Sequence, residues 1–191
     1  MSACYKSDFK GKTGNKGYSL VELIVVIAIM AIMVGVTSLG LGMMFTRDAN
    51  YVAVRIDDEL TEARTLAMSR EGVFVYSLHI DSDSKKNSIR IYKVTSEADP
   101  ISDSLTPYKE VPLDKSVTID IKNKTDSETT ITPSAGGSLN IYFDKSNGSV
   151  KKVGSNSGKG VYIFKVTSTK NSSKTKEVTL VATTGRHYTE K

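Results

Sequence analysis

The longest apolar stretch of the chain lies near its N-terminus, where no side chain from Leu23 to Phe45 is ionisable. As an α-helix with a rise of about 1.5 Å per residue, this stretch would be about 35 Å long, enough to cross the ~30 Å hydrocarbon core of a bilayer. The lysines that precede it are Lys6, Lys10, Lys12 and Lys16. A basic flank predicts that this end stays in the cytoplasm. We therefore expect a membrane-spanning helix, with the rest of the chain outside.

After Phe45 the pattern changes from uniformly apolar to amphipathic. Apolar residues recur at helical spacing, at Val52, Ile56, Leu60, Ala63 and Ala67. This spacing marks one face of a helix, and Gly72 is a natural C-terminal stop because glycine tolerates a left-handed backbone. We predict one helix from Tyr18 to about Glu71, with its first half in the bilayer and its second half packed on a domain.

Beyond Gly72 the pattern consists of short runs of β-branched and aromatic residues, which favour strands. Val73–Ile80 and Ser88–Val94 flank the polar segment Asp81–Asn87 and predict a hairpin. Further expected strands are Val117–Ile121, Leu139–Phe143, Val161–Thr167 and Glu177–Ala182.

Connections between these strands are polar. Asn147-Gly148 is the sharpest turn signal, and Ser168–Thr175 is a second expected turn. Thr95–Glu110 and Lys122–Ser138 are long and contain prolines, so we expect mobile surface loops there. The predicted fold class is α+β, a long N-terminal helix packed on a small antiparallel β domain.

The formal net charge of the 191-residue chain, +5, is concentrated before the apolar stretch. Removing residues 1–17, with their four lysines and one aspartate, from the 26 basic and 21 acidic side chains leaves a formal +2. This near balance gives no general argument for nucleic-acid binding. The single cysteine, Cys4, also precedes the stretch, so the rest of the chain has no disulfide and no thiolate.

Known catalytic patterns do not occur in the predicted β domain. It has no nucleophile elbow, no paired histidines at metal-ligand spacing and no phosphate-binding loop. His79 lies in a predicted strand beside apolar residues, which favours a packing or surface role. We therefore expect no enzyme activity, no cofactor and no metal.

Glu22 does not fit a plain membrane anchor, because a carboxylate in an apolar helix is costly without a partner. A free amine is the obvious partner. If the chain were cut after Gly17, Tyr18 would carry a positive N-terminal amine one helical turn before Glu22. The same amine on a neighbouring subunit could also neutralise Glu22.

The segment Lys16–Glu22 followed by an unbroken apolar helix resembles the class III signal of type IV prepilins and type II secretion pseudoprepilins. In that family a membrane peptidase cuts after the glycine and methylates the new N-terminal amine, and the glutamate helps subunits join a filament. The resemblance implies cleavage after Gly17, methylation of Tyr18 and an assembly role for Glu22. Tyr18 is a departure, since family members usually begin with Phe. An ordinary uncleaved signal anchor is the alternative.

Later segments extend the resemblance to H-type pseudopilins and FimT-like minor pilins. They are Glu59–Arg70, Ile141–Asp144 and Val178–Arg186. Some FimT-like members bind DNA through a C-terminal Gly-Arg-x-Arg motif, whereas here Gly185-Arg186-His187-Tyr188 lacks the second arginine. Arg186 and Lys176 are therefore candidate ligand or DNA contacts, although the sequence does not favour DNA as a partner.

The expected organisation is a cleaved basic leader (1–17), a transmembrane and filament-core half-helix (18–45), an amphipathic half-helix (46–71) and an extracytoplasmic β domain (72–191). The expected function is that of a minor pilin or H-type pseudopilin in a type IV pilus or type II secretion pseudopilus. Expected partners are prepilin peptidase, other pilins or pseudopilins in a helical filament, and the inner or cytoplasmic membrane. The expected localisation is a single-pass membrane protein with a cytoplasmic N-terminus, and later a surface or periplasmic filament. Alternatives are a DNA-binding minor pilin for natural transformation and a major pilin or adhesin.

Overall fold

The computed structural model of the chain describes residues 19–81, 87–101, 104–113, 116–125 and 128–190, and for 36–47 and 128 it describes the backbone alone. Its contacts divide the chain into two compact units, Met1–Leu41 and Gly42–Lys191. The predicted domain boundaries are finer than this division and stay predictions.

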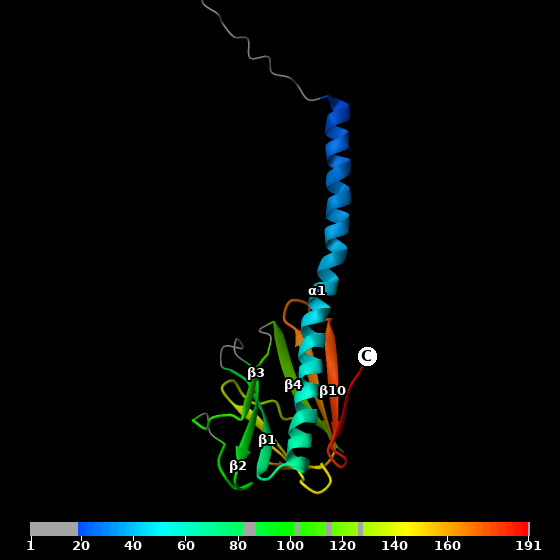
Figure 1. Cartoon of the computed structure of the whole chain (residues 1–191). Coiled ribbons are helices and arrows are strands. Elements are labelled where there is room, and N and C mark those ends of the chain that lie inside the picture. Colours follow the sequence, from blue (N-terminus) through cyan, green and yellow to red (C-terminus); the bar gives the residue numbers. More distant parts are fainter. Residues whose placement is uncertain (1–18, 82–86, 102–103, 114–115, 126–127, 191) are drawn as a thin grey trace, which may run out of the picture. The chain divides into compact units, whose positions relative to one another are not determined.

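One helix, α1, spans Leu20–Ser69 (Figure 1). The helix ends at Ser69, three residues before the predicted stop at Gly72. Gly72 has a φ of 103°, in the left-handed region that glycine tolerates. The predicted start at Tyr18 lies outside the described residues. The expected core positions are all buried, namely Val52, Ile56, Leu60, Ala63 and Ala67. The helical spacing in the sequence therefore identified the packed face correctly.

Two antiparallel sheets follow the helix. Sheet A has the strand order β3-β2-β1-β6-β7-β8. Its strands are β1 (Val73–His79), β2 (Ser88–Val94), β3 (Lys109–Pro112), β6 (Ser138–Phe143), β7 (Val150–Val153) and β8 (Asn156–Ser157). The predicted hairpin is confirmed, since β1 and β2 pair in register from Val73 opposite Val94 to His79 opposite Ser88.

Sheet B has the strand order β11-β10-β9-β4-β5. Its strands are β4 (Val117–Lys124), β5 (Glu128–Thr130), β9 (Val161–Ser168), β10 (Thr175–Val181) and β11 (Arg186–Thr189). Both expected turns are present: Gly148 in the first has a φ of 69°, and the second joins β9 to β10. The α+β class, with a helix packed on an antiparallel β domain, is thus the observed fold.

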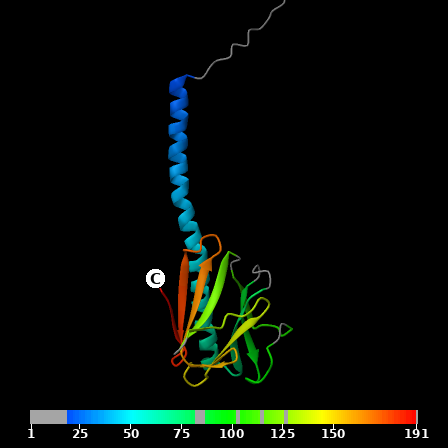
Figure 2. The ribbon, with the colours of Figure 1, turned by 180° about the vertical axis from the view of Figure 1, so that it is seen from behind.

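A single main core joins the helix residues 49–67 to the inner faces of both sheets (Figures 1 and 2). Sheet A contributes Phe74, Tyr76 and Ile141 to this core, and sheet B contributes Phe164 and Leu180. Because successive side chains of a strand point to opposite faces, each sheet also has a second, outer face.

The segment 95–110, which we expected to be a loop, is partly structured. Lys109–Pro112 forms β3 at the edge of sheet A, and Ile101 and Leu105 pack on a second apolar cluster around Val75, Tyr92 and Tyr142. The segment 122–138 likewise contains the end of β4 and the short strand β5. The prediction of loops throughout both segments was therefore wrong, because short edge strands complete each sheet.

Candidate functional site

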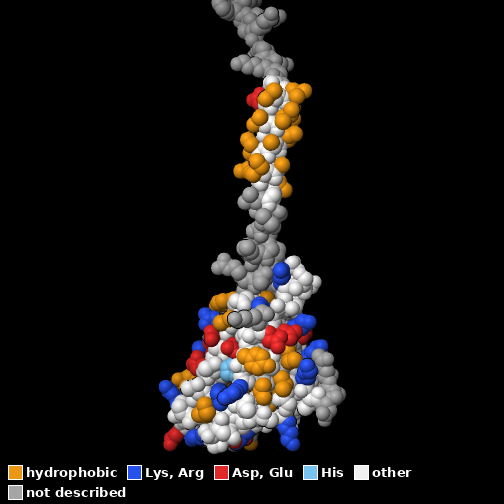
Figure 3. All heavy atoms as spheres, turned by 90° about the vertical axis from the view of Figure 1, so that its right-hand side faces the viewer, with side chains coloured by type: hydrophobic (Ala, Val, Ile, Leu, Met, Phe, Trp, Pro, Cys, Tyr) orange, Lys and Arg blue, Asp and Glu red, His pale blue; other side chains and the backbone are white. Residues whose placement is uncertain are grey.

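The first part of α1 has apolar side chains on every side. Between Leu20 and Val34 the large hydrophobic residues are 45–75% exposed, and Figure 3 shows them covering the visible face of this segment. A helix that is apolar all round is of the kind buried in lipid or in protein, rather than one that faces water. This segment therefore needs an apolar environment that the described residues of the chain do not provide.

Within the part of the chain that the structure describes, no helix is both long enough and apolar enough to cross a membrane.

Glu22 is the acidic residue in the first turn of α1, where it is exposed. Unpaired backbone N–H groups at a helix N-terminus favour a negative charge at this position. Gly17 and Tyr18, the predicted cleavage and methylation residues, lie outside the described residues. The pairing of Glu22 with an N-terminal amine therefore stays a prediction.

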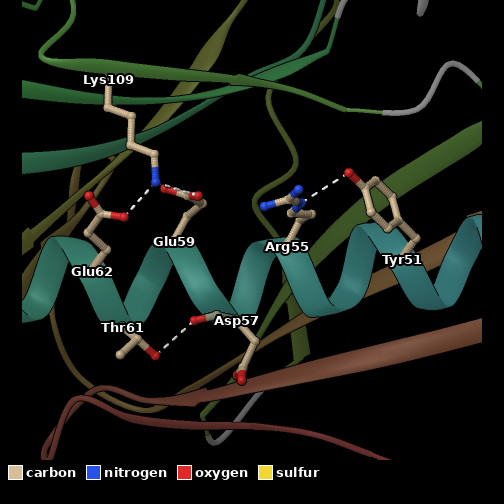
Figure 4. Close-up of polar contacts among 7 residues, drawn as sticks. All are labelled: Tyr51, Arg55, Asp57, Glu59, Thr61, Glu62 and Lys109. Carbon is tan, nitrogen blue, oxygen red and sulfur yellow. Dashed lines mark hydrogen bonds and ion pairs between the residues drawn. The ribbon is translucent and has the colours of Figure 1, made fainter.

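The second part of α1 is fixed to sheet A through a charged cluster (Figure 4). Lys109 Nζ on β3 lies 2.8 Å from Glu59 Oε1 and 2.5 Å from Glu62 Oε2. The Glu59 side chain is only 3% exposed, so its charge depends on this ammonium group. Burial would lower the pKa of Lys109, but the hydrogen bonds to the two carboxylates outweigh it and raise this pKa.

Tyr76 on β1 belongs to the same buried region. Burial, reinforced by the negative charge of Glu59, raises the pKa of the Tyr76 phenol well above its usual value, so the hydroxyl stays protonated. The interface between α1 and sheet A thus contains a buried carboxylate whose charge is balanced from the edge strand.

On the side of sheet B, Arg64 fixes α1 to two turns. Its Nε donates to Gly148 O at 3.0 Å and its Nη2 donates to Thr184 O at 3.3 Å. The turns themselves are in close contact, because a Cβ on Gly185 would lie 1.8 Å from Gly148 O. Glycine at 185, in the segment that resembles FimT-like pilins, is therefore required by packing.

His187 gives a second contact on this side. Its Nε2 lies 2.8 Å from Thr61 Oγ1 and 3.9 Å from Asp57 Oδ1, and its Nδ1 lies 3.2 Å from Gly185 O. The side chain of His187 is only 8% exposed. The C-terminal strand β11 is thus held directly against the helix.

Between these two sides, α1 leaves a row of side chains exposed, which we call the exposed stripe: Tyr51, Val54, Asp58, Thr65 and Met68. Their spacing places them along one side of the helix. Arg55 adds a positive charge beside the stripe, because its guanidinium lies 5.2 Å from the centre of the Tyr51 ring and its Nε donates to Tyr51 Oη at 3.1 Å. The stripe therefore combines apolar groups with charges of both signs.

Arg186 and Lys176 do not form one site. Arg186 lies opposite Val181 at one end of β10, and Lys176 lies opposite Val166 near the other end. The five positions between Val181 and Lys176 correspond to about 17 Å along the strand. Since Val166 faces the core and Val181 faces outward, the two basic residues also lie on opposite faces of sheet B. Lys176 Nζ itself lies 3.5 Å from Glu190 O.

Among the described residues, no three His, Cys, Asp or Glu side chains come together in a way that could hold a metal ion. The polar contacts described above instead fix α1 to the β domain on two sides.

Comparison with known proteins gives one family match. Residues 12–38 match the family described as the prokaryotic N-terminal methylation motif. This match confirms the resemblance to the prepilin class of proteins over the N-terminal region, which includes the predicted cleavage position and Glu22. No curated protein matches the chain.

Two crystal structures of the type IV minor pilin FimU from Pseudomonas aeruginosa are similar to the chain. In space group P65 the identity is 14%, the TM-score is 0.46, and the match covers 74% of this chain and 92% of that one. In space group P21 the identity and TM-score are the same, with 76% and 90% covered.

The sequence did not reveal the contacts that fix α1. The sequence offered no reason to assign a role in fixing the helix to four residues, Glu59, Arg64, Lys109 and His187. Their partners lie far away along the chain; Glu59 and Lys109, for example, are 50 positions apart. One signal in the sequence could have indicated these contacts: ionisable residues lie directly beside the buried positions of the helix. Long side chains at the edge of a buried helix face can reach the neighbouring strands.

Proposed function

We propose that the chain is a structural subunit, a minor pilin or an H-type pseudopilin, of a type IV pilus or a type II secretion pseudopilus. One observation carries the proposal: the N-terminal methylation motif continues directly into a helix that is apolar all round in its described first part. The second part of the same helix is fixed to a β domain on two sides. Such a chain can bury its first part among other helices while its domain stays outside.

The methylation motif supports a proposal for processing. A prepilin peptidase cuts after Gly17 and methylates the amine of Tyr18. Glu22 then pairs with an N-terminal amine, its own or that of a neighbouring subunit, which neutralises a carboxylate that is costly in an apolar environment.

The precursor is a single-pass protein of the inner or cytoplasmic membrane, with its N-terminus in the cytoplasm and its β domain outside. The lysines before the apolar stretch support this orientation. Assembly moves the helix from lipid into a filament, where close helix packing replaces contacts with lipid.

The test is the intact mass and N-terminal sequence of the protein extracted from membranes in which a prepilin peptidase is co-expressed. We expect a chain that begins at Tyr18, with or without one methyl group, and we expect Gly17→Ala to block the cut. A wild-type chain that still carries Lys16 and Gly17 would mean an ordinary signal anchor, and the filament proposal would fail.

The alternatives of DNA uptake and of a major pilin or adhesin stay predictions. The separation of Arg186 from Lys176 gives the DNA alternative no common binding site from these two residues. We therefore take assembly as the function that the geometry supports best.

A further inference from the structure

Two surfaces of the β-domain unit are complementary: along each, charged groups flank apolar ones, and the charges of one surface are opposite to those of the other. We propose that they bind each other between copies of this chain, with the exposed stripe of α1 in one copy lying on the outer face of sheet B in the next. This inference rests on the proposed function and adds to it the surfaces through which the domains meet.

Strand register arranges the outer face of sheet B in rows, because residues directly opposite each other share a face. The first row has acids on both sides of a lysine: Asp120, Lys165 and Glu177. The second row has a lysine on β4, followed by apolar groups and a small polar one on β9, β10 and β11: Lys122, Ile163, Thr179 and Tyr188. The third row has bases on β4 and β11 and valines between them, and Glu128 of β5 lies opposite the lysine: Lys124, Val161, Val181 and Arg186.

On β10 and β11 the outer face therefore changes from acidic through apolar to basic, from Glu177 through Tyr188 to Arg186, over about 14 Å for two steps of two residues. Tyr188, in the middle row on the edge strand β11, is 51% exposed. The side of the domain on which β10 and the C-terminal segment lie in Figure 1 carries apolar side chains with charged side chains around them (Figure 3).

Contacts with α1 give the direction of this order. Near the beginning of the packed helix, Asp48 Oδ2 accepts from Ser116 Oγ at 3.0 Å and lies 3.4 Å from Lys170, in the β9–β10 turn. Further along, Arg64 contacts Thr184, just after β10. The helix and β10 therefore run in the same direction, so the acidic row lies nearer the helix N-terminus than the basic row.

The exposed stripe has the opposite charges in the same direction. The guanidinium of Arg55 lies over Tyr51 at the N-terminal end, Val54 follows, and Asp58 comes next. Tyr51 and Asp58 are about 10 Å apart along the axis. Two parallel copies thus bring Arg55 to Glu177, Val54 to the apolar row and Asp58 to Arg186. The charged groups are about 10 Å apart on the helix and about 14 Å apart on the sheet, and the long arginine and glutamate side chains span this difference.

Such a contact is heterologous, because each copy uses a different surface on each side. Heterologous contacts that do not close into a ring produce open helical assemblies, as a filament requires. Asp58 must lie at the level of the next copy's basic row, which is close to the level of Thr61 and Arg64 in that copy. Neighbouring copies are therefore staggered by about 5–9 Å along the helix.

We expect one stripe on one sheet face to bury less than the roughly 1,200 Å² at which specific protein complexes become stable. We therefore expect the domains to associate when neighbouring helices already hold them together, since tethering raises the effective concentration. The test must accordingly use the full chain in its membrane or filament.

The experiment uses two differently tagged full chains in a Cys4→Ser background, co-expressed with a prepilin peptidase and treated with a short bismaleimide. One chain carries Val54→Cys and the other Ile163→Cys. We expect cross-linked dimers between these two chains, and at least fivefold less product when Thr118→Cys replaces Ile163→Cys. Thr118 on β4 lies on the same face of sheet B as Ile163, two rows away from the row of Ile163, and is exposed.

Charge exchange makes the test specific. Asp58→Arg on the Val54→Cys chain, or Arg186→Asp on the Ile163→Cys chain, should each lower the cross-link several-fold, and the two together should restore it. Absence of the 54–163 product, or a yield that ignores both charge changes, would overturn this contact. N-terminal processing is read from the same samples, so a processed chain without the cross-link refutes the interface alone, whereas an unprocessed chain refutes the proposed function.

Discussion

At the scale of single residues, the packing of Gly185 against Gly148 decides how the C-terminal strand meets the helix. Gly185 has a φ of 64°, and an added Cβ would lie 1.8 Å from Gly148 O and 3.0 Å from Arg64 Nε. A backbone oxygen cannot move away cheaply, so any side chain here must separate the two turns that Arg64 joins.

We predict that Gly185→Ala destabilises the β domain by about 2–4 kcal/mol, of which about 1 kcal/mol is the cost of a left-handed alanine. Gly136→Ala is the matched control, because Gly136 has a φ of 81° but no atom lies within 4 Å of its added Cβ. Thermal unfolding followed by near-ultraviolet tyrosine circular dichroism measures both, since the chain has no tryptophan. Equal losses in the two variants would show that the turn-to-turn contact does not matter.

At the scale of elements, the edge strand β3 is joined to α1 through Lys109. Replacing Lys109 with Met leaves the Glu59 carboxylate buried without its cation, which typically costs 3–5 kcal/mol. We predict a loss of this size for Lys109→Met and recovery of most of it when Glu59→Leu is added. Lys151→Met is the control, since Lys151 makes an equally short, 2.8 Å pair with Glu97 at the surface. That exposed pair should contribute less than ~1 kcal/mol.

The same interaction predicts a dependence on alkaline pH. Because the folded pKa of Lys109 is raised, its contribution to stability is fully present below the unfolded pKa of about 10.5 and is lost as the pH rises through the higher folded pKa. Urea unfolding between pH 8 and pH 11.5 should show wild type losing more stability than Lys109→Met. Parallel losses in the two proteins would assign the alkaline effect to other groups.

Elements also show what sequence can and cannot predict here. The six longer strands were predicted, because each is long enough to show its own pattern: Ser88–Val94 has its observed bounds, and the bounds of the other five differ by one to three residues. The short strands β3, β5, β7, β8 and β11 were missed, since two to four residues carry no pattern and pair only where a longer neighbour offers an edge. In the candidate site, the local context of Glu22 was enough to propose a role for it, and that role stays a prediction. The partners of Arg64 and His187 instead depend on how distant turns meet.

At the scale of the whole molecule, the division into two units separates assembly from folding. The apolar first part of α1 belongs to Met1–Leu41, and the packed core of the domain belongs to Gly42–Lys191. A change in the first unit should therefore alter how chains associate without altering how the domain unfolds. Glu22→Gln is suited to test this, because it removes the charge while it keeps the size and helical preference of the side chain.

We predict that Glu22→Gln lowers the amount of chain in sheared filaments about tenfold, which corresponds to a loss of about 1.4 kcal/mol in the association step. Cleavage after Gly17 and the unfolding temperature of the domain should stay as in wild type. Ser19→Ala, three positions earlier, is the control for a general effect of altering this end of the helix. If Glu22→Gln assembled as well as Ser19→Ala, the glutamate would be a neutral feature of the signal, and the pairing of its carboxylate with an N-terminal amine would not drive assembly.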